Sequence, residues 1–145
     1  MKCLLIIPAY NEAENIEKVV NSIVQDYPQY DYIVVNDGSK DDTESICIKN
    51  GYQILNLPIN MGIGGAVQTG YCYARDNDYD IAVQIDGDGQ HDVSFLADMI
   101  RLIEENKADV VIGSRFVEKE GFQSSQMRRI GINFLSNLAW ILTGV

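Results

Sequence analysis

The sequence has few cysteines, few basic residues and no long apolar run, and each shortage excludes a class of protein. Its three cysteines lie far apart without a CxxC pair, so they suggest neither a zinc site nor a disulfide framework and fit a reducing cytosol. The 11 Lys and Arg against 21 Asp and Glu give a formal net charge of -10, which argues against a nucleic-acid binder. No run approaches the roughly 20 apolar residues of a membrane span, and the residues before Pro8 are too few for a signal peptide.

Short apolar runs alternate with amphipathic stretches along the 145 residues, which fit one globular domain. We expect strands over residues 3–7, 32–35, 53–57, 81–85 and 109–113, with helices near 12–26, 41–50, 63–77 and 93–106. The first helix should bury one face, formed by Ile16, Val19, Val20, Ile23 and Val24. Apolar strands separated by helices predict an α/β fold of the doubly wound kind, with a mostly parallel sheet and helices on both faces.

Polar clusters follow four of the five expected strands. They read PAYNE at 8–12, NDGS at 36–39, IDGDGQHD at 85–92 and GSR at 113–115. Because ligands of open parallel sheets bind beyond the carboxyl ends of the strands, we expect the chemistry to lie along one edge of the sheet.

The first two clusters also have purely structural interpretations. Asn11 could cap the first helix while Glu12 favours its positive end, and Ser39 or Asp41 could cap the second helix. Asp37 directly follows an apolar strand, where a carboxylate can accept a hydrogen bond from a base N–H or a ribose hydroxyl.

The glycines of NMGIGGAVQTG (60–70) allow a tight turn, close packing or the close approach of a ligand. Gly62 and Gly64 match the first two positions of a dinucleotide-binding fingerprint, but its third position falls on Val67. The preceding strand is also the third rather than the first. A dinucleotide-binding oxidoreductase domain is therefore only an alternative.

Asp86 and Asp88, separated by one small residue, project to the same side of an extended strand end and can share a divalent ion. An EF-hand is disfavoured because His91 and Ala97 occupy the positions of its glycine and glutamate. The alternative is that Asp92 caps the next helix and the other carboxylates are solvated turn residues.

Together these motifs resemble the family-2 glycosyltransferases of the GT-A type, especially the polyprenyl-phosphate sugar transferase branch. The matching segments are IIPAYNE, VVNDGSKDDT, NMGIGGAVQTG, IDGDGQHD and VIGSR, in the order and spacing of the family. The resemblance implies an inverting transferase that moves a sugar from a UDP- or GDP-sugar to an acceptor with the help of Mg²⁺ or Mn²⁺. A non-catalytic nucleotide-sugar-binding module is a further alternative.

The resemblance also implies roles for individual residues. Pro8, Tyr10 and Glu12 would line the nucleoside pocket with Gly64 nearby, and Asp37 would recognise the base. Asp86 and Asp88 would form the DxD motif, with Asp88 in direct contact with the metal and Asp86 closer to the ribose or a metal-bound water. Gln90 would assist at the metal, and Arg115 would meet the diphosphate or the acceptor.

We expect residues 116–145 to form a flexible Gly- and Ser-containing segment followed by an apolar helix that includes Trp140. The alternative is that this helix simply packs on the sheet or on a further part of the protein. Guanidinium groups suit phosphate, so Arg128 and Arg129 are expected to meet a polyprenyl phosphate acceptor at a membrane surface. The family continues beyond this point, and we expect residues 1–145 to be its donor-binding part, truncated at the carboxyl terminus. The expected location is the cytoplasm, at the inner face of the membrane.

Overall fold

The computed structural model describes residues 1–87 and 95–113. The chain divides into two compact units, Met1–Val111 and Ile112–Val145. The fold described below is that of the first unit. The expected segment at 116–145 lies outside the described residues, and the expected single domain over residues 1–145 stays a prediction.

Four parallel strands form a sheet in the order β3-β2-β1-β4. The strands are β1 (Cys3–Ala9), β2 (Asp31–Asn36), β3 (Ile54–Asn56) and β4 (Ile81–Gln84). In the register of the central pair, Leu4 lies opposite Asp31 and Ala9 lies opposite Asn36. All seven residues of β1 are buried, because this strand has a neighbour on each edge and helices on each face.

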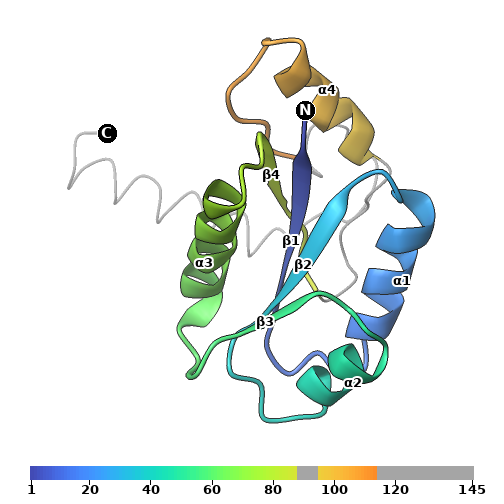
Figure 1. Ribbon diagram of the computed structural model, residues 1–145, viewed down its shortest axis with the longest axis vertical. Coiled ribbons are helices and arrows are strands. Elements are labelled where there is room, and N and C mark those ends of the chain that lie inside the picture. Colours follow the sequence, from blue (N-terminus) through green and yellow to red (C-terminus); the bar gives the residue numbers. More distant parts are fainter. Residues whose placement is uncertain (88–94, 114–145) are drawn as a thin grey trace, which may run out of the picture. The chain divides into compact units, whose positions relative to one another are not determined.

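Helices cover both faces of this sheet (Figure 1). They are α1 (Ile16–Asp26), α2 (Thr43–Lys49), α3 (Gly62–Asp76) and α4 (Leu96–Glu104). Residues of α1, α2 and α4 pack with Leu5 and Ile7 of β1, while residues of α3 pack with Leu4 and Ile6 on the opposite face. The predicted doubly wound α/β fold is therefore confirmed.

The contact between α3 and β1 depends on a glycine. A Cβ atom added at Gly70 would overlap with Cγ2 of Ile6, so a side chain there would force one of the two elements to shift. The helix backbone therefore rests directly on the central strand, which explains part of the glycine content of the segment at 60–70.

Two expectations about apolar residues are wrong. Residues 109–113 form no strand, and Val110 and Ile112 are 76% and 84% exposed. An apolar run becomes a strand only when a neighbouring strand accepts and donates its hydrogen bonds, and in the described part of the chain β4 is the last strand on that side. Val24 is 46% exposed, because the buried face of α1 is limited to Ile16, Val19, Val20 and Ile23.

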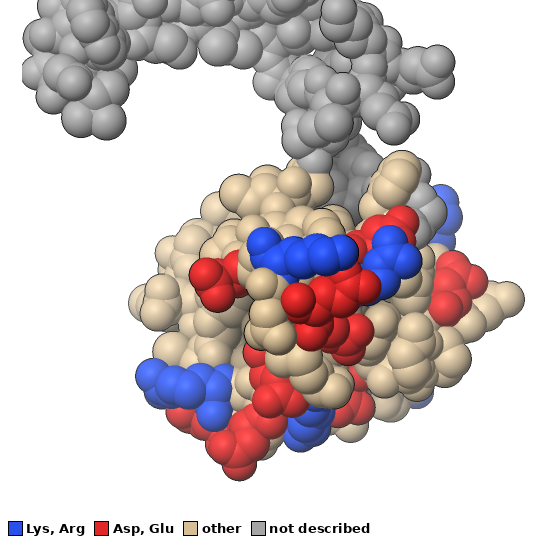
Figure 2. Space-filling model, turned by 90° about the horizontal axis from the view of Figure 1, so that it is seen from above, with Lys and Arg blue, Asp and Glu red and all other residues tan. Residues whose placement is uncertain are grey.

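Charges of both signs lie side by side at the end of the molecule where the strands begin, which Figure 2 views from above. On α4, Arg101 pairs with Asp98 at 2.9 Å, and after this helix Lys107 pairs with Glu105. On this face of the described residues, acidic groups thus lie beside the basic ones. Within the described residues, no helix has the length and apolar character needed to cross a bilayer.

Candidate functional site

The change in strand order lies between β1 and β4. The chain moves from β1 to β2 and β3 on one side of the sheet, and then returns to place β4 on the other side of β1. Open α/β sheets bind their ligands at such a switch point, beyond the carboxyl ends of the strands. The predicted clusters PAYNE and IDGDGQHD begin at the ends of β1 and β4, on the two sides of this switch point.

The ends of β1 and β4 approach each other closely at Gly87. The backbone N–H of Ile85 donates to the carbonyl oxygen of Ile6 at 2.9 Å, which extends the pairing beyond β4. A Cβ atom at Gly87 would lie 2.9 Å from the carbonyl oxygen of Pro8, so glycine permits this approach. The structure thus brings the predicted residues Pro8 and Asp86 to the same edge, on adjacent strands.

Asp86 is half-buried at this edge, and its Oδ1 accepts a hydrogen bond from Nε2 of Gln84 at 3.0 Å. Gln84 is exposed and lies at the end of β4. A carboxylate in such a position offers a hard oxygen ligand to a divalent ion and remains reachable from solvent. Its role in metal or nucleotide binding stays a prediction.

Asp37 is buried, with 3% of its surface exposed, and lies just after β2. Its backbone N–H donates to the carbonyl oxygen of Ala9 at 2.8 Å, and its Oδ1 accepts the N–H of Met61 at 2.7 Å. One carboxylate oxygen therefore fixes the start of α3, a function that the sequence did not reveal. The predicted contact of Asp37 with a base remains a prediction.

Tyr10 and Glu12 follow β1 and differ in their surroundings. Tyr10 is 42% exposed, whereas Glu12 is half-buried and its Oε2 accepts a hydrogen bond from Nδ2 of Asn15 at 2.9 Å. The carbonyl oxygen of Glu12 also accepts the N–H of Ile16 at 2.8 Å. Glu12 thus helps to begin α1, and Tyr10 presents its ring to solvent at the sheet edge.

Asn11 joins the loop after β1 to the loop after β2, an arrangement that the sequence interpretation missed. Its N–H donates to Oγ of Ser39 at 3.0 Å, and its Oδ1 accepts the N–H of Lys40 at 2.8 Å. The expected capping role of Asn11 is wrong, because α1 begins at Ile16 and its N-cap position is Asn15. A signal was nevertheless present, since Asn is one of the few residue types that tolerate the left-handed conformation found here, with φ 56°.

Asp41 and Thr43 form a second link between the same two loops. The N–H of Glu12 donates to Oγ1 of Thr43 at 2.9 Å, and the N–H of Ala13 donates to Oδ2 of Asp41 at 3.0 Å. The Thr43 hydroxyl donates in turn to Oδ1 of Asp41, which also accepts the Thr43 N–H. The N-cap position of α2 is Asp42, so the expected alternatives of Ser39 or Asp41 at that position are wrong.

These donors determine the ionisation of Asp41. Loss of hydration works against its charged form, but hydrogen bonds from the Thr43 hydroxyl and from the Ala13 and Thr43 amides prevail and lower the pKa of Asp41 below its ordinary value. The carboxylate is therefore charged at neutral pH and accepts three bonds of this link, while the Thr43 hydroxyl accepts the Glu12 N–H.

The glycine-rich segment forms the first turns of α3. Gly62 has φ +78°, which confirms the expected turn, and Gly64 is exposed with open space around its Cβ direction. These glycines follow β3, an edge strand, and β2 separates β3 from the β1 and β4 junction. The dinucleotide fingerprint requires the glycines beside that junction, so the oxidoreductase alternative loses its structural basis.

Several predicted site residues lie outside the described residues, namely Asp88, Gln90, Arg115, Arg128 and Arg129. Across residues 1–87 and 95–113, no three His, Cys, Asp or Glu side chains are grouped so that they could hold a metal ion. Of the predicted metal ligands, the structure thus describes Asp86 alone.

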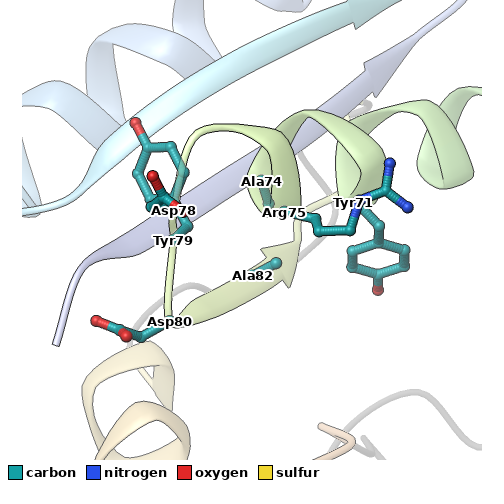
Figure 3. A pocket seen from close by; sticks show the side chains of 7 residues that line it. All are labelled: Tyr71, Ala74, Arg75, Asp78, Tyr79, Asp80 and Ala82. Atoms are coloured by element: carbon teal, nitrogen blue, oxygen red, sulfur yellow. The ribbon is translucent and has the colours of Figure 1, made fainter.

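A cavity of about 450 Å³ lies at the opposite end of the sheet (Figure 3). It is lined by Tyr71 and Arg75 of α3, by the turn after that helix, and by Asp80 and Ala82 at the start of β4. Two of its charged groups already have partners, since Arg75 pairs with Asp76 at 2.8 Å and Asp80 accepts the Lys2 N–H at 2.7 Å. The predicted polar clusters lie at the other end of the sheet, so we assign the candidate site to the switch point and not to this cavity.

Curated relatives of the chain include lipid-phosphate sugar transferases. It is 34% identical to the UDP-N-acetylglucosamine–dolichyl-phosphate N-acetylglucosaminyltransferase of Methanococcus voltae, with 97% of this chain and 62% of that protein covered. It is 28% identical to the polyprenol monophosphomannose synthase of Mycolicibacterium smegmatis, with 94% and 53% covered. The chain thus spans somewhat more than half the length of these two relatives.

Solved structures with similar folds contain nucleotide and metal. The structure of S. aureus TarS 1-349 in complex with UDP superposes with a TM-score of 0.64 at 25% identity, covering 86% of this chain and 39% of that one. Glucosyl-3-phosphoglycerate synthase from Mycobacterium tuberculosis, in complex with Mn²⁺, UDP and glucosyl-3-phosphoglycerate, gives 0.55 at 28% identity, covering 70% and 39%.

The match to a family extends over nearly the whole chain, from residue 4 to residue 141. It includes all four strands of the sheet and every polar cluster at their carboxyl ends. The chain belongs to glycosyl transferase family 2.

Proposed function

We infer that the chain binds a nucleoside diphosphate sugar at the switch point between the carboxyl ends of β1 and β4, as the donor-binding part of an inverting glycosyltransferase. The observation that carries this proposal is the convergence of Pro8, Gly87 and Asp86 at the carboxyl ends of two adjacent strands, where the sheet changes direction. Tyr10 lies exposed beside them and offers a ring to the nucleoside. The UDP in the TarS and synthase structures supports the same ligand class.

A divalent ion fits the residues at this site. Asp86 contributes a half-buried carboxylate oxygen, and the proposed ligands Asp88 and Gln90 follow within four residues along the chain. Mg²⁺ and Mn²⁺ both prefer such hard oxygen ligands, and Mn²⁺ is present in the synthase structure. When bound, the ion supplies Lewis-acid stabilisation of the diphosphate leaving group.

The proposed acceptor is a polyprenyl phosphate. Both relatives described above carry names that specify dolichyl phosphate or a polyprenol monophosphate product. A phosphate acceptor is already ionised, so it needs no general base, and Arg128 and Arg129 are the proposed partners of its phosphate, with Arg115 near the diphosphate or acceptor. Peripheral contact with the inner face of a membrane follows from a lipid acceptor.

Calorimetric titration of the chain with UDP, GDP and NAD, each with and without Mn²⁺, tests the donor proposal. We expect UDP or GDP to bind with Mn²⁺ and to bind much more weakly without it, because phosphates and carboxylates repel each other in the absence of a cation. NAD should not bind. Tight NAD binding, or nucleoside diphosphate binding that is indifferent to the metal, would contradict the proposal.

The acceptor proposal has a separate test in steady-state kinetics. In the full-length enzyme of which this chain is the proposed donor-binding part, replacing Arg128 and Arg129 together by Ala should raise the KM for polyprenyl phosphate far more than the KM for the sugar donor. An unchanged acceptor KM, or efficient transfer to a soluble alcohol instead of the lipid phosphate, would show that the acceptor is wrongly assigned.

A further inference from the structure

Asn11 has a positive φ although it does not follow the end of a helix. Three non-glycine residues in the described part of the chain have positive φ, namely Asn11, Asp78 and Asn106. Asp78 and Asn106 each lie two residues beyond the end of a helix, where the left-handed conformation is an ordinary way to finish a helix. Asn11 lies between β1 and α1, where no helix ends, so its strain needs another explanation.

Contacts with the loop after β2 compensate that strain. Three successive backbone amides, those of Asn11, Glu12 and Ala13, donate to the side chains of Ser39, Thr43 and Asp41 in that order. The Asn11 side chain returns a bond by accepting the Lys40 N–H. Consecutive amides bound in this way fix the direction of the backbone immediately after Tyr10.

Thr43 is central to this arrangement because its hydroxyl makes two bonds at once. It accepts the N–H of Glu12 and donates to the carboxylate of Asp41, and the residue is fully buried. A buried donor that loses its partner remains unsatisfied. The Glu12 amide therefore keeps its position only while a hydroxyl occupies position 43.

We propose that Asn11, Asp41 and Thr43 are positioning residues that hold Tyr10 and Glu12 ready for the nucleoside diphosphate. Their side-chain bonds go to loop amides and to each other. In this role they hold the loop in its binding conformation before the ligand arrives, which removes an ordering cost from binding. This inference rests on the proposed function. It adds that residues of a neighbouring loop set the affinity of the site for the sugar donor.

The test compares Thr43→Val with Thr43→Ser by calorimetric titration with UDP and Mn²⁺. Valine keeps the shape but removes the hydroxyl, and should weaken UDP binding by about tenfold, equivalent to about 1.4 kcal/mol. Serine keeps the hydroxyl and should bind UDP nearly as tightly as the parent. Amide hydrogen exchange at residues 11–13 should accelerate in the valine variant only, and exchange in α3 should stay unchanged.

Tyr79→Phe is the matched control for stability. It removes the hydrogen bond from the Tyr79 hydroxyl to Asp31 at the opposite end of the sheet, so any loss of UDP affinity in this variant would reflect general destabilisation. We expect its UDP affinity to equal that of the parent. If Thr43→Val does not fold, Asn11→Gly replaces it, because glycine accepts positive φ but removes the bond to Lys40 at an exposed position.

Each outcome is decisive. Weaker UDP binding in Thr43→Val or Asn11→Gly, with the serine and phenylalanine variants near the parent, supports the positioning role. If the parent binds UDP and a folded Thr43→Val or Asn11→Gly variant binds UDP equally well, the positioning role is wrong but the proposed function stands. A parent that binds neither UDP nor GDP in Mn²⁺ overturns the proposed function and this inference with it.

Discussion

The two ends of the sheet are both rich in polar contacts, but these contacts do different things. At the amino end, Asp80 accepts the Lys2 N–H and Asp31 accepts the Tyr79 hydroxyl, so polar groups satisfy each other where strands begin. At the carboxyl end, side chains of one loop bind successive backbone amides of another, and Tyr10 stays exposed. Polarity is thus common to both ends of the sheet, whereas the bonds from side chains of one loop to successive backbone amides of another lie at the carboxyl end.

Two glycines, one at each end of the sheet, also differ in how closely other residues pack against them. Gly51 lies between α2 and β3 at the amino end, and Gly38 lies after β2 at the carboxyl end, with nearly equal φ of +69° and +65°. Nothing lies within 4 Å of a Cβ built at Gly51, but at Gly38 it would lie 2.8 Å from the backbone nitrogen of Asn60. The carboxyl end is thus the one where the backbones of two loops are packed against each other.

The largest effect on ligand binding is expected for the metal ligand. Asp88→Asn should weaken UDP binding in Mn²⁺ by about a hundredfold, because an amide oxygen replaces a charged ligand of a doubly charged ion. Asp78→Asn at the amino end is the control, and Asn accepts the positive φ of that position. Calorimetry that finds equal affinities for Asp88→Asn and the parent would remove Asp88 from the metal site.

The next effect concerns the glycine pair. Gly51→Ala should lower the free energy of unfolding by about 1 kcal/mol, the cost of a side chain in the left-handed region. Gly38→Ala should cost about 3 kcal/mol, because the methyl group also collides with the backbone at Ile59 and Asn60. Urea denaturation of both variants measures the difference. Equal losses would mean that the loop at 59–60 moves away freely and that the carboxyl end is not tightly packed.

The sequence predicted the fold well, because the burial of parallel strands leaves a local signature. The runs CLLII and IVV recur as buried strands, and each is followed by an amphipathic segment that forms a helix. The run at 109–113 has the same signature without forming a strand, since strand formation depends on a neighbour that local sequence does not specify.

The site was predicted only in part. Pro8, Asp37 and Asp86 are at the carboxyl edge as expected, because strand ends can be located from the apolar runs. The links from Asn11 to Ser39 and from Glu12 to Thr43 join residues 28 and 31 positions apart, and a turn motif read locally cannot show which amides its side chains bind. For the same reason the bond from Asp37 to Met61 was not foreseen.

A smaller effect on stability is expected when the pH is lowered and Asp41, at the carboxyl end of the sheet, gains a proton. The folded-state pKa of Asp41 lies below its ordinary value of 3.8, so its contribution to stability is present above that value and is lost as the pH falls through the lower folded pKa. The Asp41→Asn variant has no carboxylate at this position, so its free energy of unfolding should lack this pH-dependent contribution. The difference in unfolding free energy between parent and variant, measured by denaturation at about pH 5 and about pH 3, should therefore shrink at the lower pH; a constant difference would show that the carboxylate is not stabilised.

The smallest effect on stability is expected when the pH is raised and Tyr79, at the amino end of the sheet, loses its proton. Loss of hydration, followed by the bond to Asp31, raises the pKa of Tyr79 from 10.0 to about 12. This contribution to stability is fully present below the unfolded pKa and is lost as the pH rises from 10.0 to about 12. The stability difference between the parent and Tyr79→Phe should decrease over that interval in denaturant titrations. An increase with pH would mean that the folded protein favours the phenolate.

The central claim is that the ligand binds at the carboxyl end of the sheet, and paramagnetic broadening by Mn²⁺ tests it most directly. Nuclear magnetic resonance spectra of the ¹⁵N-labelled chain would be recorded with UDP and substoichiometric Mn²⁺, with Mg²⁺ as the diamagnetic reference. We predict that the amide signals of Tyr10, Glu12 and Asp86 broaden strongly while those of Asp78 and Tyr79 persist. Broadening centred on Asp78 to Asp80, or none near Asp86 while UDP is bound, would contradict the account.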